Sequence, residues 1–267
     1  MFTDTHCHLY FDVFDADRDQ VIERAINAKV VRMLTPGIDL YTSRLAVELA
    51  ERYPEIYATV GIHPNSAKDW NKGSLAELRD LAVHPKVVAI GEIGLDYYRD
   101  KAPKSQQKQI FHEQLKLAAE VGLPVILHNR LASHDMLDIL AGWRAEYSTG
   151  TDTEAFPGVM HSYSDGLETA MHVLSMGFFL GITGPVTFLN ARNLQGVVSS
   201  LPIGRLLIET DAPFLTPHPN RGRRNEPANV VQIVQKIASL KDLPIETVAE
   251  VTTANADQLF HWREIVD

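Results

Sequence analysis

Two histidines stand one residue apart near the start of the chain, in MFTDTHCHLYF, and their spacing permits metal binding. His6 and His8 flank Cys7. Side chains alternate between the two faces of a β-strand, so an extended chain here would point both imidazoles to one side and Cys7 to the other. A neutral imidazole is a common metal ligand. An H-x-H pair alone is weak evidence, because such short patterns also arise by chance.

Further residues of ligand type each stand at the end of a short apolar run, namely Glu92, His128, His161 and Asp211. If these runs are parallel strands, the four side chains meet the N-terminal histidines at one edge of the sheet. Buried charged groups are rarely left without a partner. Four imidazoles and two carboxylates can hold two divalent cations, with one carboxylate bridging them. Convergence on metal therefore accounts for all six residues.

The elements that would position these residues alternate along the chain. Short apolar, β-branched runs predict strands within residues 2–8, 30–37, 56–64, 87–96, 124–130, 158–163, 178–184 and 206–213. Amphipathic stretches of helical period lie between them, for example at 16–28, 41–53, 74–84 and 106–122. Polar stretches that predict loops or helix entries are 101–109, 148–154 and 216–229.

About eight strands, each followed by helical sequence, predict a (β/α)8 TIM barrel, because 267 residues is near the usual length of that fold. The barrel is expected to form one domain, residues 1–267. Strands of a barrel present their catalytic side chains at their C-terminal ends, where the six candidate ligands fall. A doubly wound open sheet shows similar alternation and is the alternative fold.

Composition and charge narrow the class of protein. The chain is 45% hydrophobic and 22% charged, as ordinary globular proteins are. No apolar run reaches the roughly 18 residues of a membrane span, so no membrane partner is expected. The absence of a signal-peptide pattern and the single cysteine indicate a cytoplasmic protein. A net charge of −9 argues against a broad basic surface that coats nucleic acid, but allows one phosphate in a small cleft.

The remaining histidines divide into three sets. His63 ends an apolar run in GIHP, where it either contacts substrate or orders its loop with a hydrogen bond. His218 lies in a long loop, and the sequence assigns it no role. Helical or helix-edge positions, with surface or packing roles, are expected for His84, His112, His134, His172 and His261.

Taken together and in order, the motifs resemble the TatD family of metal-dependent deoxyribonucleases, in the amidohydrolase superfamily. They are DTHCHL, VGIHP, GEIGLDYY, LPVILHNR, ETDAPFLTP, RGRRNEPANV and TTANADQLF. Each fragment is modest alone, but their joint order is specific and extends from the first expected strand to the final helix. The resemblance implies a barrel of the metallo-dependent hydrolase type.

The resemblance also implies a binuclear centre that holds two divalent metal ions. Histidine ligands suit Zn, Mn or Ni, whereas Mg prefers oxygen, so the identity of the metal stays open among these four. In this resemblance one ion is bound by His6 and His8 beside Asp211, the other by His128 and His161, and Glu92 is the bridge.

The implied activity is hydrolysis of phosphodiester bonds in DNA by a monomer or weak homo-oligomer. Asp211 would orient a water molecule and accept its proton. Arg130 and His63 would hold the phosphate. The segment Arg221–Arg224 either contacts the nucleic-acid backbone or is a solvated loop. Asp165 lies in HSYSDG, where many relatives read HCFSGS, and it adds a negative charge near the expected phosphate.

Two other functions are compatible with the same residues. A hydrolase with this metal centre could act on another ester or amide, such as aminoacyl-tRNA. Related barrels that act on phosphotriesters commonly use a carboxylated lysine as the bridge, and Glu92 at the matching strand argues against that chemistry. A metal-dependent binding or scaffold protein is the third possibility. The six-ligand set disfavours it, because a purely structural site needs no open position for water.

Overall fold

The alternation of apolar and amphipathic stretches in the sequence appears in the structure as alternating strands and helices. The computed structural model describes residues 1–99, 101–147 and 157–262. Within those ranges the strands are β1 Phe2–Asp4, β2 Val30–Pro36, β3 Ile56–Val60, β4 Val87–Asp96, β5 Val125–Arg130, β6 Gly158–Met160, β7 Phe179–Ile182 and β8 Leu206–Ile208. Each strand pairs in parallel with the next, in the order β1 to β8.

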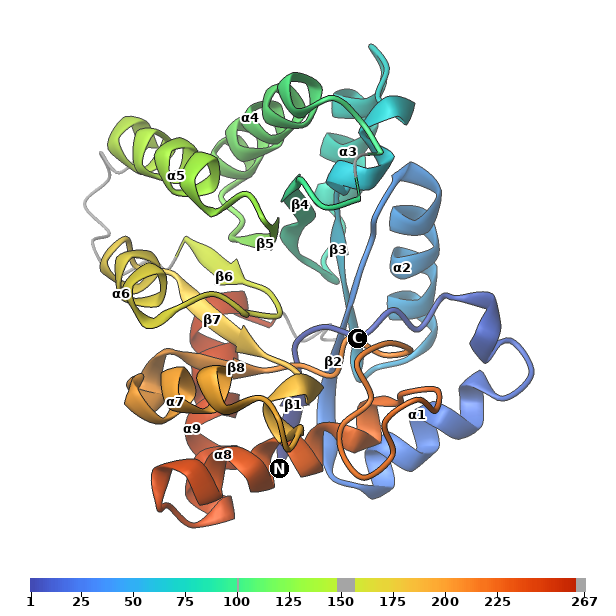
Figure 1. Cartoon of the computed structure of the whole chain (residues 1–267). Coiled ribbons are helices and arrows are strands. Elements are labelled where there is room, and N and C mark those ends of the chain that lie inside the picture. Colours follow the sequence, from blue (N-terminus) through green and yellow to red (C-terminus); the bar gives the residue numbers. More distant parts are fainter. Residues whose placement is uncertain (100, 148–156, 263–267) are drawn as a thin grey trace.

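Helices surround these strands (Figure 1). In the described residues they are α1 Arg18–Asn27, α2 Leu40–Arg52, α3 Ser74–Ala82, α4 Lys104–Val121, α5 Ser133–Tyr147, α6 Leu167–Ser175, α7 Arg192–Ser200, α8 Val230–Lys241 and α9 Ile245–Phe260. Helix α2 begins at a capping box, in which Asp39 accepts from the Thr42 amide at 2.7 Å and the Thr42 hydroxyl accepts from the Asp39 amide at 3.0 Å. Helix α4 ends at Gly122, whose φ of 69° is in the left-handed region.

Hydrogen bonds between the two ends of the sheet close the barrel. The Thr5 amide donates to the Ile208 carbonyl at 3.0 Å, and the Asp211 amide donates to the His6 carbonyl at 2.8 Å. An isolated parallel bridge joins Cys7 to Ala212. The predicted (β/α)8 barrel is therefore confirmed, and the alternative of an open doubly wound sheet is wrong.

The first strand is shorter than the sequence predicts. β1 ends at Asp4 rather than continuing to residue 8. Beyond Asp4 the backbone alternates between two neighbours, because the Cys7 amide donates to Leu34 of β2 while the His8 amide donates to Ala212 after β8. The predicted first strand is thus a short ladder followed by a segment that joins the first and last strands and carries His8.

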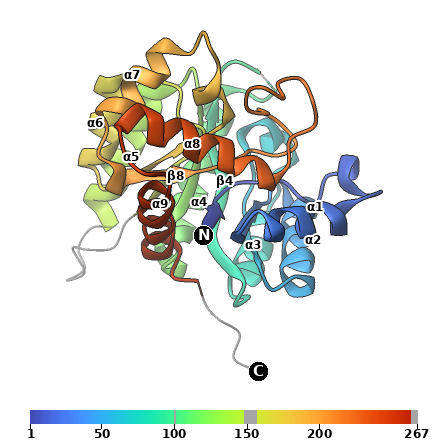
Figure 2. The ribbon, with the colours of Figure 1, turned by 90° about the horizontal axis from the view of Figure 1, so that it is seen from below.

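The inside of the barrel changes from apolar to polar along each strand. On β5, Ile126 is followed two residues later by His128, and after Leu207 of β8 come Glu209 and Asp211 at the same spacing. The lower, apolar residues form one buried cluster with the end of α9. That helix packs against β1 and β8 and is seen beside the N-terminus in Figure 2. The bottom of the barrel is therefore filled, and the polar side chains collect at the top.

The structure describes two of the three polar stretches that the sequence predicts to be loops or helix entries. The stretch 101–109 leads into α4, and 216–229 is a loop that ends in a short 3-10 helix. The predicted loop 148–154 lies outside the described residues. Among the residues described, no helix combines the length and the apolar character needed to cross a membrane.

Candidate metal centre

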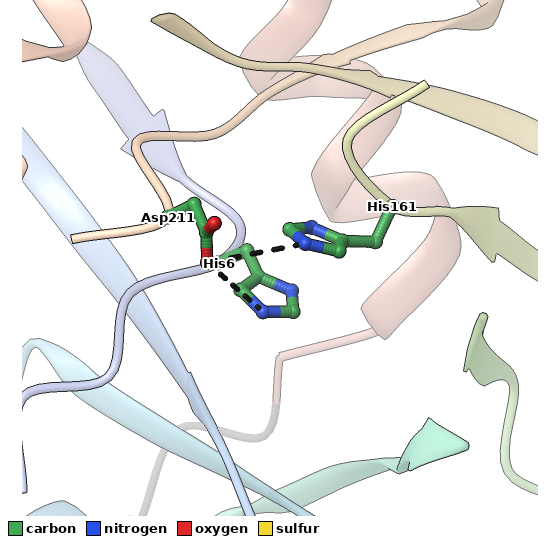
Figure 3. A group of neighbouring side chains, drawn as sticks. All are labelled: His6, His161 and Asp211. Atoms are coloured by element: carbon green, nitrogen blue, oxygen red, sulfur yellow. Dashed lines mark ion pairs between the residues drawn. The ribbon is translucent and has the colours of Figure 1, made fainter. Parts of the chain in front are cut away.

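Imidazoles and carboxylates from separate strands converge at the top of the barrel. In Figure 3, His6 and His161 both face the Asp211 carboxylate. Asp211 Oδ1 lies 3.8 Å from His6 Nε2 and 3.9 Å from His161 Nε2. The two rings are stacked, with centroids 3.5 Å apart. His8 completes this inner end of the cluster, with its Nε2 at 3.5 Å from Asp211 Oδ1.

Glu92 lies between this inner end and two further histidines. Its Oε2 is 3.3 Å from His6 Nε2 and 3.8 Å from His8 Nε2. Its Oε1 faces the other way, at 2.8 Å from His128 Nδ1 and 3.5 Å from His63 Nε2. The two oxygens of one carboxylate thus face two different pairs of imidazoles, which is the arrangement that a bridging ligand requires. His63 and His128 form the outer end of the cluster.

The structure brings together all six residues that the sequence nominates as ligands. It places His161 against His6 and Asp211, and it places His63, rather than His161, in ring contact with His128. The assignment of His161 to the second ion stays a prediction. The five other histidines expected in helical or helix-edge positions are found there, at the ends or on the faces of α3, α4, α5, α6 and α9.

Cys7 takes no part in this cluster. Its thiol is buried and lies 3.5 Å from the Leu34 carbonyl, on the face away from the neighbouring imidazoles. Burial raises the pKa of this thiol well above its usual value. The thiol therefore lies on the opposite side from the two imidazoles, as the H-x-H spacing predicts.

Two carboxylates that the sequence reasoning missed support the cluster from behind. His161 donates from Nδ1 to Glu209 Oε2 at 2.9 Å, and Glu209 is fully buried. His128 Nε2 lies 3.3 Å from Asp96 Oδ2. A histidine that ligates metal commonly donates its other ring proton to such a carboxylate, which fixes the ring and frees the first nitrogen. The two-residue step from Leu207 to Glu209 to Asp211 was the available signal for Glu209.

His63 is oriented in the opposite sense from His161. Its Nδ1 accepts a hydrogen bond from the Asn65 amide at 3.0 Å. Burial lowers the pKa of His63 to about 3, and the nearby His128 acts in the same direction. A neutral imidazole has one donor and one acceptor nitrogen, so the Nε2 that faces the cluster carries the proton. His63 therefore presents a hydrogen-bond donor there rather than a lone pair.

Three of the candidate ligands, Glu92, Asp211 and His6, are in the protonation state that metal binding requires. Burial raises the pKa of Glu92, but the histidines around it, His63 and His6 above all, hold that pKa well below its usual range. Burial likewise opposes ionisation of Asp211, and His8 and His161 outweigh it, so its pKa is lowered. Burial lowers the pKa of His6 and keeps it neutral. Ionised carboxylate and neutral imidazole are the forms that bind divalent ions.

His161 differs, because its carboxylate partner favours the charged form. Burial lowers the pKa of this imidazole, but the charge of Glu209 and its hydrogen bond overcome that effect and raise the pKa to about 9. Asp211 has a φ of 56°, a left-handed conformation that aspartate tolerates better than most residues.

The donor set of this structure fits divalent metal. His6 Nε2 and His8 Nε2 face each other at 3.2 Å, although each is directed at a carboxylate as well. His6 Nδ1 is buried without a hydrogen-bond partner among the described residues. Facing imidazole nitrogens are poorly satisfied by one shared proton, whereas a cation between nitrogen and carboxylate donors satisfies both. Even without His63, four imidazoles and two carboxylates supply enough donors for two ions among the residues described.

A cavity of about 610 Å³ opens above the cluster. It is lined by Arg130, the last residue of β5, and by Arg99, in the turn after β4. Arg130 is exposed and lies over the ring of Tyr98, with 3.9 Å between Cζ and the ring centroid. The carboxylate of Asp165 accepts from Asn129 and Ser133 at 3.0 and 2.6 Å. The charge that Asp165 adds is thus engaged by two donors, while both arginines face the cavity.

The arginines after β8 are used mainly within the protein. Arg224 donates to Asp17 at 2.7 Å through each of its two terminal nitrogens, and it also contacts Glu226. Arg221 lies over the Phe188 ring at 4.3 Å. Arg224 therefore ties this loop to the start of α1. These contacts favour the solvated-loop interpretation over contact with the nucleic-acid backbone.

Comparison with known proteins agrees with this geometry. The family model described as TatD related DNase matches residues 3–261. A relative from Bacillus subtilis (strain 168), an uncharacterized metal-dependent hydrolase YabD, is 47% identical over 97% of this chain and 99% of its own. The 3'-5' ssDNA/RNA exonuclease TatD of Cronobacter sakazakii is 39% identical over 92% and 93%.

A solved structure gives the same result. The crystal structure of YJJV, a TatD homolog from Escherichia coli K12, superposes with a TM-score of 0.89 at 31% identity and covers 97% of this chain and 98% of that one. The sequence match, the relatives and the shared barrel agree along nearly the whole chain. This chain therefore belongs to the TatD family and is a metal-dependent hydrolase.

Proposed function

We propose that this protein hydrolyses phosphodiester bonds of DNA on a binuclear metal centre. The observation that supports this most is the position of Glu92, whose Oε2 faces His6 and His8 while its Oε1 faces His128. Two ions sharing that carboxylate form the kind of clamp that two-metal phosphodiester hydrolysis uses. The exonuclease name of a close relative supports the same substrate.

The ligands in this proposal come from both ends of the cluster. His6, His8 and Asp211 would hold one ion, and His128 and His161 would contribute to the other, with Glu92 shared. Ions bound here supply Lewis-acid activation of water and of the phosphate oxygens. The remaining work belongs to the side chains around them.

Asp211 is suited to handle the proton of the attacking water. Its Oδ1 faces the inner histidines, and its lowered pKa keeps it ionised at neutral pH. A carboxylate in that state can both orient water and accept its proton. On the opposite side, the Nε2 proton of His63 is available to a phosphate oxygen.

Arg130 would hold the substrate from above. It is at the open end of β5, two residues after His128, and lines the cavity. The planar guanidinium can give two parallel hydrogen bonds to one phosphate. Asn129 and Asp165 lie beside it and have each other as partners, so they leave the guanidinium free to turn towards substrate.

The test is a substrate screen on purified protein with measured metal content. We expect Mn²⁺- or Zn²⁺-loaded protein to release nucleotides from DNA, and a chelator or Asp211→Asn to abolish that release. Single-stranded DNA, duplex DNA, RNA and aminoacyl-tRNA should be compared under the same conditions. Turnover of aminoacyl-tRNA alone, with intact DNA, would replace this proposal by the ester hydrolase.

A further inference from the structure

An aromatic side chain stands exposed at the mouth of the cavity. Phe214 lies in the loop after β8, lines the cavity, and is 51% exposed. A phenylalanine ring in water forgoes a favourable burial of apolar area. Its exposure beside a polar site therefore has a cost in stability that a bound ligand would offset.

The loop that carries this ring is fixed by hydrogen bonds. The Phe214 amide donates to the Asp211 carbonyl at 2.7 Å. The Phe214 carbonyl accepts from Asn225 Nδ2 at 2.7 Å, and the same nitrogen donates to the Thr210 carbonyl at 2.8 Å. Asn225 is itself fully buried. The ring is thus held at the mouth by its backbone rather than placed there by a flexible loop.

The ring lies over the inner end of the cluster. Its centroid is 6.3 Å from that of His8 and 5.7 Å from that of Phe11, both in T-shaped contact. About half of the residue's surface is exposed, so part of the ring is not covered by protein. A flat ligand can therefore reach the ring while a neighbouring group reaches the metal ligands.

A second aromatic stands at the outer end. Tyr98 is 59% exposed, and its ring carries the guanidinium of Arg130. The Tyr98 amide donates to Asp96 Oδ1 at 2.9 Å, and the other oxygen of Asp96 faces His128. Phe214 thus adjoins His8 at the inner end, and Tyr98 is connected through Asp96 to His128 at the outer end.

We propose that Phe214 is a stacking platform for the nucleobase next to the scissile phosphate, and that the Tyr98–Arg130 pair receives the nucleotide on the other side. This inference rests on the proposed nuclease function. The phosphate would lie over Glu92, and the bases would leave it in two directions. Two neighbouring bases that are held in separate places cannot stay stacked on each other, so the strand cannot remain in a regular duplex where it is cut. Stacking tolerates any base, because every base has a π face.

Binding is tested by fluorescence, without turnover. Single-stranded oligonucleotides carry 2-aminopurine at one end or the other, and stacking quenches that base. Chelator-treated wild-type protein should quench the label at one end, and Phe214→Ala should lose that quenching while Phe214→Tyr keeps it. Equal quenching by wild type and Phe214→Ala would overturn the proposal.

Catalysis is tested with strands whose nucleotides next to the cut either carry a base or are abasic. Base–aromatic contacts are worth about 5- to 150-fold in binding when the aromatic is replaced by alanine. Phe214→Ala should therefore reduce kcat/KM on the base-bearing strand by about that factor more than on the abasic strand. Equal losses on both strands would show that the ring acts only by packing on His8, and would overturn the proposal.

Two comparisons keep these results interpretable. Leu189→Ala removes a side chain that lies after β7, is 81% exposed and does not line the cavity. It should change neither the ratio of kcat/KM between the two strands nor the quenching of 2-aminopurine. Metal content equal to that of wild type shows that each variant is folded. Failure of wild type to cleave any strand would overturn the nuclease function itself, whereas cleavage with equal losses would overturn only the base contact.

Discussion

His161 and His63 face the same cluster from its two ends, but their far nitrogens have opposite partners. His161 gives its Nδ1 proton to the Glu209 carboxylate, so a metal ion that displaces the proton on Nε2 finds a lone pair there. His63 accepts at Nδ1 from the Asn65 amide, which leaves a proton on Nε2. One histidine is prepared to bind a cation and the other to donate a hydrogen bond, although both are buried among the same groups. The partner behind an imidazole therefore decides its role as much as its distance from the site.

The largest effect is expected where the two ends share a residue. Glu92→Gln removes the charge that faces four histidines, and we expect metal content and activity to fall together. The loss of kcat should exceed about 100-fold, because replacing a residue that only supports a metal ligand already costs up to about that factor. Metal analysis and turnover measure it. A variant that keeps two ions and normal turnover would show that Glu92 is no bridge.

Glu209→Gln changes the inner partner alone. The amide can still accept from His161 but carries no charge, so the ring loses the charge that strengthens its Nδ1 hydrogen bond. We expect metal affinity to fall about 10- to 100-fold. Competition with a chelator measures the change, and Glu246→Gln, a carboxylate on α9 away from the cluster, is the matched control. Unchanged affinity would mean that His161 does not bind metal.

Arg130 tests substrate binding apart from metal binding. Both Arg130→Lys and Arg130→Ala should keep the full metal content, because guanidinium ligates nothing. The alanine variant should lose about 1.5–3 kcal/mol of transition-state binding on DNA, roughly 10- to 150-fold in kcat/KM, and lysine somewhat less. Equal losses on an uncharged ester would contradict the phosphate role. Arg79→Ala, on the outer surface of α3, serves as control.

His63→Ala sharpens the comparison at the outer end. If Nε2 is a donor, both ions stay and only a hydrogen bond is lost, which lowers kcat/KM by about 2- to 10-fold. The same substitution at His161 should lower metal content instead. Loss of an ion from His63→Ala would show that the Asn65 amide does not set the role of this ring.

The smallest effect concerns the loop that supports the inner end. The hydrogen bonds from Arg224, and then those from Arg24, lower the pKa of Asp17 to about 2. A lowered folded pKa contributes stability above the unfolded value near 3.8, and that contribution disappears as pH falls through 2. Asp17→Asn should therefore melt slightly below wild type at pH 7, with the gap closing between about pH 4 and pH 2. Glu23→Gln, in the helix that follows Asp17, is the control. A gap in melting temperature that is independent of pH would show that the Asp17–Arg224 ion pair does not contribute to stability.

Much of the architecture was predictable because each level of the sequence carries the same information. Eight apolar runs, helical periods between them and ligand-type residues at the run ends all indicate the barrel and its top. The residues behind the ligands were harder to find. Glu209 follows the same two-residue spacing as Asp211, yet nothing in the sequence says that its carboxylate reaches His161 on another strand, 48 positions away.

The role of His63 could not be settled from the sequence for a related reason. The sequence left two possibilities, a substrate contact or a loop-ordering hydrogen bond. The structure shows the loop-ordering hydrogen bond at Nδ1. Because that bond leaves the proton on Nε2, it also prepares Nε2 for a substrate contact. That coupling depends on the turn after β3, where the Asn65 amide points back at the ring. A one-dimensional pattern records neither the direction of an amide nor the tautomer that it selects.

The most direct test of the shared centre is a crystal structure of protein loaded with Mn²⁺, measured for anomalous scattering. We expect two peaks roughly 3.5–4 Å apart, with one oxygen of Glu92 on each. The Cys7 sulfur should contact neither peak, and His63 Nε2 should remain unligated. A single peak, or two peaks that Glu92 does not join, would contradict the account.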